Sequence, residues 1–392
     1  MTGGEPPEGA AGRAREDAAS TAWQEGRAAG QAPAERRLLA TIAAGRSARM
    51  QRALVLVMST MSALVLLAAG SGWLLASYVS DHLTRLDAGT SGTPASGPLN
   101  ILLAGVDVRS GLTRHQQFLL HVGHVASHNS DTLIIVHVSA DHRHVEAISV
   151  PRDSWVRIPG YGMNKINAAI GLGGPKLMVR TVEELTGLTI NDYVEVNFLG
   201  FVKVIDALGG VNICLPYAVD DPYTGLHLSA GRHHVNGIRA LQFARDRHSF
   251  PLSDLSRISD QQQLLASVLT EAVSSGTLTD PLRFARFLAA ITSAIRVDQG
   301  FDVVSLARQL RFVRPNDVTF VTVPLANTSY LTPTGQSAVL WNWQAARTLF
   351  AQIASDRLVR HRRARTRRAG QPARGASSPG NRPKTAAQAA CR

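Results

Sequence analysis

The chain has 392 residues, a formal net charge of +12, 45% hydrophobic residues and 18% charged residues. This composition excludes a chain that is disordered throughout, and two cysteines are too few for a disulfide framework or a zinc ribbon. Residues 357–392 hold ten Arg, one Lys and no acidic residue, so they carry +11 of the net charge. Because the rest of the chain is close to neutral, a nucleic-acid-binding protein is not expected.

The N-terminal region is expected to contain a membrane anchor. Residues 1–52 lack apolar periodicity and are rich in Gly, Ala, Glu and Arg, which predicts a disordered cytoplasmic segment. Residues 53–80 carry no charge, and as a helix they would span about 42 Å, more than the roughly 30 Å of a bilayer core. A buried core helix is the less favoured alternative. Arg46, Arg49 and Arg52 precede this stretch, so the positive-inside rule predicts a single-pass cell-membrane protein with an extracellular C-terminal part.

Composition and periodicity divide the remainder of the chain. Residues 81–98 are predicted to be a linker, residues 99–355 a folded domain, and residues 356–392 a basic disordered tail. Strands are predicted at residues 100–106, 131–138, 145–150, 193–198 and 318–323. Helices are predicted at residues 166–169, 176–186, 198–208, 236–247, 259–273, 281–295, 303–312 and 337–353. Strands interleaved with helices indicate an α/β or an α+β domain.

Polar residues lie at the ends of the predicted strands, where ligands bind in open α/β sheets. Asp107 follows the first strand, Asp131 opens the second, and Asp153 follows the third. Five arginines and a glutamine accompany them: Arg109, Arg152, Arg245, Arg247, Arg257 and Gln261. Each alone is more often a turn residue or a surface ion-pair partner. Together they predict a site for a metal-bound phosphate or pyrophosphate, because Arg forks match phosphate oxygens and carboxylates suit Mg²⁺.

Several long motifs resemble the LytR-CpsA-Psr family of bacterial cell-wall glycopolymer transferases, in its actinobacterial form. The resemblance runs from about Leu99 to Leu325. It is carried by SDTLIIVHV, ISVPRDSWVRIPGYGMNKINAAIGLGGP, TVEELTGLTINDYVEVNFLGFVKVIDALGGV, GLHLSAGRHHVNGIRALQFARDR and SRISDQQQLL. It implies a three-layer α/β/α sandwich, behind one transmembrane helix, with a hydrophobic tunnel for a lipid tail.

The resemblance also implies an activity. Family members move a glycan with one phosphate from a polyprenyl-pyrophosphate carrier to a hydroxyl of peptidoglycan, which forms a phosphodiester and releases polyprenyl phosphate. The residues that match the family's Mg²⁺ ligands are Asp107 and Asp131. Those that match its pyrophosphate-binding residues are Arg109, Arg152, Arg245, Arg247, Arg257 and Gln261. Neither the residues nor the resemblance decides between Asp131 and Asp153 as the base that takes the acceptor proton.

The sequence departs from the family pattern in three places, and two alternative functions are not excluded by it. Asn129 stands where Arg or Lys is frequent, residues 110–128 hold four histidines, and the chain ends in an arginine-rich tail. The histidines predict either a polar active-site loop or, less favoured, a zinc site. A pyrophosphatase would use the same residues with water as the acceptor. A non-enzymatic, membrane-bound transcriptional attenuator is less favoured, because residues 1–52 lack a helix-turn-helix pattern.

Overall fold

The computed structural model describes residues 58–62, 77–94, 96–107, 113–120, 130–246, 253–274, 280–356, 384–385 and 389. The chain divides into two compact units, Met1–Leu75 and Ala76–Arg392. In the described part of the first unit, residues 58–62 are helical. Across the residues described, no helix is both long enough and apolar enough to cross a bilayer. The predicted cytoplasmic segment 1–52 and most of the predicted anchor 53–80 lie outside these residues.

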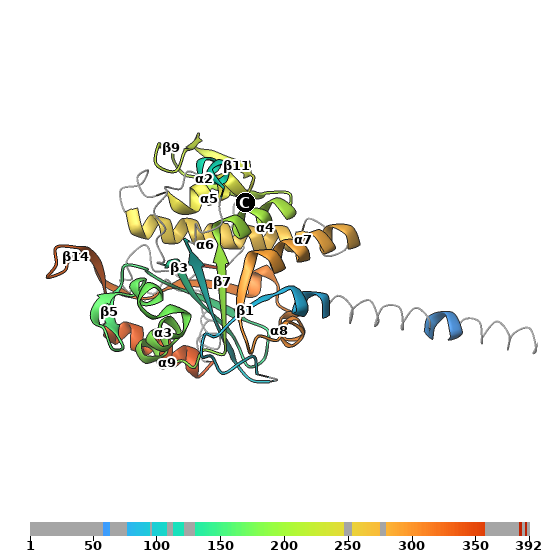
Figure 1. Ribbon diagram of the computed structural model, residues 1–392, viewed down its shortest axis with the longest axis horizontal. Coiled ribbons are helices and arrows are strands. Elements are labelled where there is room, and N and C mark those ends of the chain that lie inside the picture. The colour runs from blue at the N-terminus through green and yellow to red at the C-terminus, as the bar shows by residue number, and fades with distance from the viewer. Residues whose placement is uncertain are drawn as a thin grey trace, which may run out of the picture. The chain divides into compact units, whose positions relative to one another are not determined.

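A mixed sheet of eight strands lies at the centre of the described part of the second unit (Figure 1). The strand order is β1-β12-β7-β2-β3-β4-β13-β16. The strands are β1 Thr84–Leu86, β2 Leu99–Val106, β3 Ser130–Val138, β4 Val145–Val150, β7 Asp192–Asn197, β12 Ile295–Asp298, β13 Val318–Thr322 and β16 Lys384–Thr385. The central strands β2, β3 and β4 are antiparallel neighbours, whereas β7 and β13 lie parallel to β2 and β4.

Helices cover both faces of this sheet, which gives the predicted α/β/α layering (Figure 1). On one face, α3 and α9 pack against alternate buried residues of β2, β3 and β4. On the other face, α6 and α8 pack against the intervening residues of the same strands. The helices are α2 Arg114–Leu119, α3 Ala168–Thr186, α4 Phe198–Ala207, α5 Gly237–Arg245, α6 Ser253–Ser274, α7 Pro281–Ala294, α8 Val303–Leu310 and α9 Trp343–Ala354, with the 3₁₀ turn η1 Pro315–Asp317.

Four two-stranded ribbons surround the main sheet in the described residues. They pair β5 Trp155–Ile158 with β6 Gly162–Lys165, β8 Val211–Leu215 with β11 Gly231–Val235, β9 Val219–Asp221 with β10 Leu226–Leu228, and β14 Leu325–Leu331 with β15 Ser337–Trp341. Cys214, on β8, is disulfide-bonded. All four ribbons were missed by the periodicity analysis, because strands this short carry little alternation of their own.

One helix prediction needs correction. Residues 337–353 were predicted as one helix, but residues 337–341 form β15 and only Trp343–Ala354 is helical. The side chain of Asn342 accepts a hydrogen bond from the Ala345 backbone N–H, so the helix begins there, after β15 has paired with β14. The two helices predicted at residues 166–169 and 176–186 correspond to the two parts of α3, which are separated by a kink with non-helical dihedrals at Gly173 and Gly174.

The predicted linker and tail also contribute to the fold. Within residues 81–98, β1 pairs in parallel with β12, and the Thr93 hydroxyl donates to Asp192. Within residues 356–392, β16 pairs with β13, and Ala389 packs against the core between the sheet and α6. Neither segment is therefore entirely without structure. Composition did not predict these edge strands, because each consists of only two or three residues. Their backbone hydrogen bonds form without apolar side chains, so the composition of the segment does not reveal them.

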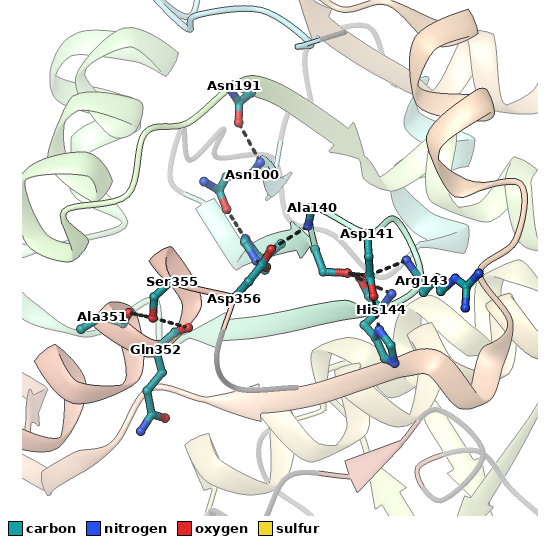
Figure 2. Close-up of polar contacts among 12 residues, drawn as sticks. Asn100, Ala140, Asp141, Arg143, His144, Asn191, Ala351, Gln352, Ser355 and Asp356 are labelled. Atoms are coloured by element: carbon teal, nitrogen blue, oxygen red, sulfur yellow. Dashed lines mark hydrogen bonds and ion pairs between the residues drawn. The ribbon is translucent and has the colours of Figure 1, made fainter. Parts of the chain in front are cut away.

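A buried polar cluster closes the end of the sheet where β2 begins and β3 ends (Figure 2). Asp356 follows α9 and accepts hydrogen bonds from the Ala140 backbone N–H (2.8 Å) and the ring Nε2 of His137 (3.0 Å). The other ring nitrogen of His137 lies 2.7 Å from the Oδ1 of Asn100. Burial lowers the pKa of His137, and the carboxylate of Asp356 acts in the opposite direction. The cluster fastens the end of α9 to the sheet.

A second polar cluster at the same end contains Asp192, which is fully buried. Its carboxyl accepts from the Thr93 hydroxyl (2.7 Å), and burial raises its pKa to about 7, with further effects from Asp298 and Asp302. The pKa in the folded state thus exceeds the ordinary value of 3.8, so the folded chain holds this proton more tightly than the unfolded chain does. The stability that the proton contributes is complete below about pH 4 and is lost as the pH rises through about 7.

We therefore expect the wild-type protein to lose stability relative to Asp192→Asn between pH 5 and pH 7.5. The amide stays neutral, so only the wild-type carboxyl releases a proton, and the relative loss should be roughly 1–3 kcal/mol. Urea unfolding of both proteins at the two pH values measures this difference. Asp81→Asn, which changes an exposed carboxylate, is the control and should show no such trend. A difference that is independent of pH would contradict the assignment.

Candidate functional site

Two of the predicted carboxylates meet at the opposite end of the sheet. Asp107 directly follows β2, and Asp131 lies at the start of β3, which runs antiparallel to β2. The register shifts between Gly105 and Val106, and the Ser130 hydroxyl donates to the carbonyl oxygens of Gly105 (3.3 Å) and Thr132 (2.8 Å) at this irregularity. Antiparallel pairing therefore brings Asp107 and Asp131, which are 24 positions apart in the sequence, to the same end of the sheet.

The turn between β4 and β5 adds Arg152 and Asp153 to this end of the sheet. Arg152 forms an ion pair with Asp131, and its Nε lies 3.2 Å from the Asp153 carboxylate. The Nζ of Lys165, on β6, lies 3.2 Å from the other oxygen of Asp153. The side chains of Arg152 and Asp153 are only 12% and 14% exposed, so these charges are largely removed from water and compensate one another.

Ser154 holds this turn in place. Its buried hydroxyl donates to the Pro151 carbonyl oxygen (2.6 Å) and accepts from the indole N–H of Trp341 (2.8 Å). The backbone N–H of Val339 donates to the Asp153 carbonyl oxygen (2.9 Å). The ribbon β14–β15 thus supports the turn that carries Arg152, although it lies far away in the sequence.

Helices α5 and α6 supply the remaining predicted residues. Arg245 is in the last turn of α5, where its guanidinium lies 5.1 Å from the centre of the Phe198 ring and donates to the Leu120 carbonyl oxygen (2.9 Å). Arg257 and Gln261 are one turn apart on α6 and therefore share a face. The Gln262 amide fixes the rotation of α6 by donating to the hydroxyls of Ser149 (3.0 Å) and Thr322 (3.2 Å).

These groups surround a cavity of about 430 Å³ between the sheet end and helices α4, α5 and α6. Its polar side chains include Asp107, Asp131, Arg152, Arg245, Arg257 and Gln261. Its apolar side chains are Leu103, Ile134, Val196, Phe198, Phe201, Leu241, Ala244, Leu264 and Leu265. The volume is typical of small-molecule sites, which span roughly 300–1,000 Å³. The cavity therefore suits an amphiphilic ligand with an anionic group and an apolar chain.

The structure gathers six of the predicted site residues around this cavity. Asp153 does not line it and instead contacts Arg152 and Lys165. Arg109, Arg247, Asn129 and His121, His124 and His128 lie outside the described residues. His115 belongs to α2, whose Thr113 forms a capping box with Gln116, so at least this part of the predicted loop is helical. Lys165 is not among the predicted site residues, although its motif NKIN belongs to the stretches that carry the resemblance.

The donor set can hold a divalent cation only with help from other ligands. Within the described residues, no group of three His, Cys, Asp or Glu side chains could hold a metal ion by itself. Asp107 and Asp131 supply hard oxygen ligands to one cavity, and Mg²⁺ is commonly held by one or two carboxylates together with water and substrate phosphate oxygens. The two carboxylates therefore fit a magnesium ion that arrives with a phosphate ligand.

The carboxyl group of a neighbouring residue, Asp260, carries less negative charge near neutral pH than an ordinary aspartate does. Asp260 is on α6 between Arg257 and Gln261. Burial raises its pKa to about 7, and the nearby Asp246 carboxylate adds to this effect. Near neutral pH much of the Asp260 population is therefore uncharged and does not cancel the positive charge that the arginines present to the cavity.

The profile of the LytR_cpsA_psr family matches residues 78–348, which include every element of this cavity. The chain belongs to the LytR-CpsA-Psr family. The cell wall biosynthesis protein LcpA of Corynebacterium glutamicum is 34% identical over 337 residues, which cover 76% of this chain and 65% of LcpA. A polyisoprenyl-teichoic acid–peptidoglycan teichoic acid transferase, TagU of Oceanobacillus iheyensis, is 37% identical over 187 residues, or 46% of this chain and 53% of TagU. The chain thus spans less than two thirds of the length of these relatives.

Solved structures of LytR-CpsA-Psr proteins have the same fold. A LytR-Csp2A-Psr enzyme from Actinomyces oris superposes with a TM-score of 0.53 at 22% identity, covering 69% of this chain and 95% of that one. Bacillus subtilis TagV gives a TM-score of 0.52 at 23% identity, with coverages of 68% and 98%. The family's sheet and flanking helices are therefore those described above.

The hydrogen bonds of Ser154 hold the turn between β4 and β5, and this role leads to a stability prediction. Ser154→Ala removes the acceptor of the buried Trp341 indole N–H, and an unsatisfied buried donor costs about 1–3 kcal/mol. Urea unfolding measures the change. Ser293→Ala removes an exposed helix-surface hydroxyl and should change the unfolding free energy by less than about 0.5 kcal/mol. Equal effects of the two substitutions would rule out a special role for Ser154.

Proposed function

We propose that this LytR-CpsA-Psr protein is a phosphotransferase. It moves a glycopolymer with one phosphate from a polyprenyl-pyrophosphate carrier to a peptidoglycan hydroxyl and so forms a phosphodiester link in the cell wall. The observation that carries this proposal is the cavity, which joins three arginines and two carboxylates to an apolar wall. A polyprenyl pyrophosphate has the same division into an anionic group and an apolar chain. The similarity to TagU, a polyisoprenyl-teichoic acid–peptidoglycan teichoic acid transferase, supports the same reaction.

In this proposal the arginines hold the pyrophosphate. Arg152, Arg245 and Arg257 present guanidinium groups to the polar end of the cavity, where bidentate hydrogen bonds to phosphate oxygens are available. Gln261 adds an uncharged amide. Phosphoryl transfer depends mainly on positioning and on neutralising charge, so fixed cations stabilise the negative charge that grows on the departing polyprenyl phosphate.

Asp107 and Asp131 would hold Mg²⁺ in this proposal. When bound, Mg²⁺ would neutralise charge on the pyrophosphate oxygens. Asp131 and Asp153 are the two candidates for the base that takes the acceptor proton, because both carboxylates form ion pairs with Arg152 at this end of the sheet. The acceptor oxygen then bonds to the glycan-bearing phosphorus as the bridging oxygen departs with polyprenyl phosphate.

The apolar wall accounts for the lipid chain. Phe198 and Phe201 from α4, Leu241 from α5, and Leu264 and Leu265 from α6 line the cavity together with the charged residues, and the Phe198 ring centre lies 5.1 Å from the Arg245 guanidinium. Burying apolar area stabilises a bound chain by about 25 cal/mol per Å². The lipid thus provides binding energy remote from the reacting phosphorus, while the charged end provides orientation.

We also propose that the LytR-CpsA-Psr domain acts outside the cytoplasm, anchored to the cell membrane by residues 53–80 with the N-terminus inside. The disulfide at Cys214 supports this location, because disulfides persist in oxidising compartments and are rare in the cytoplasm. A periplasm-type or extracellular reporter fused to the C-terminus of the full-length chain should be active, and one fused before Arg46 should be inactive. The reverse pattern would contradict the proposed orientation.

The reaction is tested with the full-length protein in mild detergent. The protein is incubated with a polyprenyl-pyrophosphate-linked oligosaccharide, peptidoglycan fragments and Mg²⁺. Mass spectrometry should detect a glycan–phosphate–peptidoglycan product and polyprenyl phosphate, and a chelator should prevent both. Formation of free glycan phosphate at an equal rate with or without peptidoglycan would instead identify a pyrophosphatase, the second candidate, which uses the same cavity with water as the acceptor.

Substitutions at the polar end should abolish transfer without unfolding the domain. Asp131→Ala removes one proposed Mg²⁺ ligand and should reduce the transfer rate to background. Arg152→Lys and Arg257→Lys should each weaken binding of the donor by about 1.5–3 kcal/mol, because a single ammonium cannot replace a bidentate guanidinium. Calorimetry with a short prenyl pyrophosphate measures this loss. Arg308→Lys, on the exposed surface of α8, is the matched control, and an equal effect there would argue against a specific phosphate site.

A further inference from the structure

The ribbon β5–β6 extends directly from the charged end of the cavity. Asp153 precedes Trp155, the first residue of β5, and its ion pair with Lys165, the last residue of β6, joins the base of the ribbon to Arg152. Trp155 lies directly opposite Lys165 in the strand register. A ligand lying on this ribbon would therefore reach the site at Asp153, next to the proposed reacting phosphate.

One face of the ribbon is core and the other faces outward. Val156 and Ile158 on β5 are fully buried against the core that contains α3. Because side chains alternate along a strand, the residues between them belong to the other face. Arg157 lies opposite Met163 on that face; the arginine is exposed and the methionine is 53% exposed.

The outward face combines cationic and flat apolar groups. It begins with Lys165 and the half-buried Trp155 beside the site and continues to Arg157 and Met163. Tyr161, in the turn at the far end, is 53% exposed, and its hydroxyl donates to the Leu172 carbonyl oxygen (3.1 Å) on α3. The tyrosine ring is thus held in position and still exposed, which lowers the entropy cost of binding a ligand against it.

We propose that the outward face of the β5–β6 ribbon, formed by Trp155, Arg157, Tyr161, Met163 and Lys165, binds the acceptor glycan strand of peptidoglycan. This inference rests on the proposed function and names the surface for its second substrate. Sugar rings present flat C–H faces that pack on exposed aromatic side chains, and peptidoglycan carries carboxylates that complement Arg157 and Lys165. The apolar cavity wall suits the lipid of the donor, so the acceptor approaches the phosphate from the polar end, where the ribbon begins.

The test separates the acceptor from the donor. With the full-length protein, Trp155→Ala and Arg157→Ala should each raise the KM for a soluble peptidoglycan glycan fragment by about tenfold or more, as expected for loss of a central aromatic or arginine contact. The KM for the lipid-linked donor should change less than about twofold. Trp155→Phe should retain most of the acceptor affinity, because the ring remains.

Matched controls are available on α8 and directly after it. Phe312 is 66% exposed and Arg308 is also exposed, so Phe312→Ala and Arg308→Ala remove the same kinds of side chain from another surface. Both controls should leave the acceptor KM unchanged. A normal acceptor KM in both ribbon variants, or an equal rise in the acceptor and donor KM values, would overturn the proposal. If Trp155→Ala fails to fold by circular dichroism, the exposed Arg157→Ala decides the outcome.

A direct binding measurement tests the proposed binding surface separately from the proposed reaction. Calorimetry of the wild-type protein with the same glycan fragment, without donor, should give a measurable Kd that Arg157→Ala weakens by about tenfold. If the wild type binds the fragment in this way but transfers nothing to it, the proposed reaction fails and the binding surface stands. If transfer proceeds but fragment binding does not depend on Arg157 or Trp155, the binding surface fails and the reaction stands.

Discussion

The site depends on one charge arrangement, the position of Arg152 between the carboxylates of Asp131 and Asp153. All three side chains are largely withdrawn from water, so each carboxylate needs the guanidinium close by. Arg152 also joins two separate parts of the chain, the start of β3 and the turn after β4. An arriving pyrophosphate would compete with Asp131 for this guanidinium, which leaves the Asp131 carboxylate to a divalent cation. The ion pairs thus balance the charges of these three side chains.

The scaffold around this arrangement is built from interactions at a distance from it. Ser154 and Trp341 hold the turn, and Gln262 fixes the rotation of α6 so that Arg257 and Gln261 face the cavity. At the opposite end of the sheet, His137 and Asp356 attach the end of α9. Rigid support matters for the proposed reaction, because phosphoryl transfer gains most of its rate from positioned charges rather than from covalent chemistry. The ion pairs of Asp153 with Arg152 and Lys165 connect the charged residues of the cavity to the β5–β6 ribbon.

The errors of the sequence analysis have a common cause. Residues 337–341 were assigned to a helix because they continue the apolar pattern of α9, but backbone pairing with β14 makes them a strand. Residues 84–86 and 384–385 were assigned to a linker and a tail, yet both add edge strands to the sheet. Residues 84–86 and 384–385 pair with strands far away in the sequence, whereas residues 337–341 pair with the strand directly before them. Local periodicity carries no record of backbone pairing in any of these cases.

The sequence by itself determined most of the long strands and helices, the family, and six of the residues that line the cavity. Apolar runs such as residues 131–138 are buried on both faces and leave little choice of structure, while Asp107, Asp131, Arg152, Arg245, Arg257 and Gln261 stand in motifs long enough to identify. Only the tertiary structure decided how these residues divide their roles. It put Asp153 outside the cavity and against Lys165, placed an apolar wall next to the arginines, and turned Trp155 and Arg157 outward beside them. The physical reason is that strand register and helix packing, which set these distances, arise from contacts between segments that are distant in the sequence.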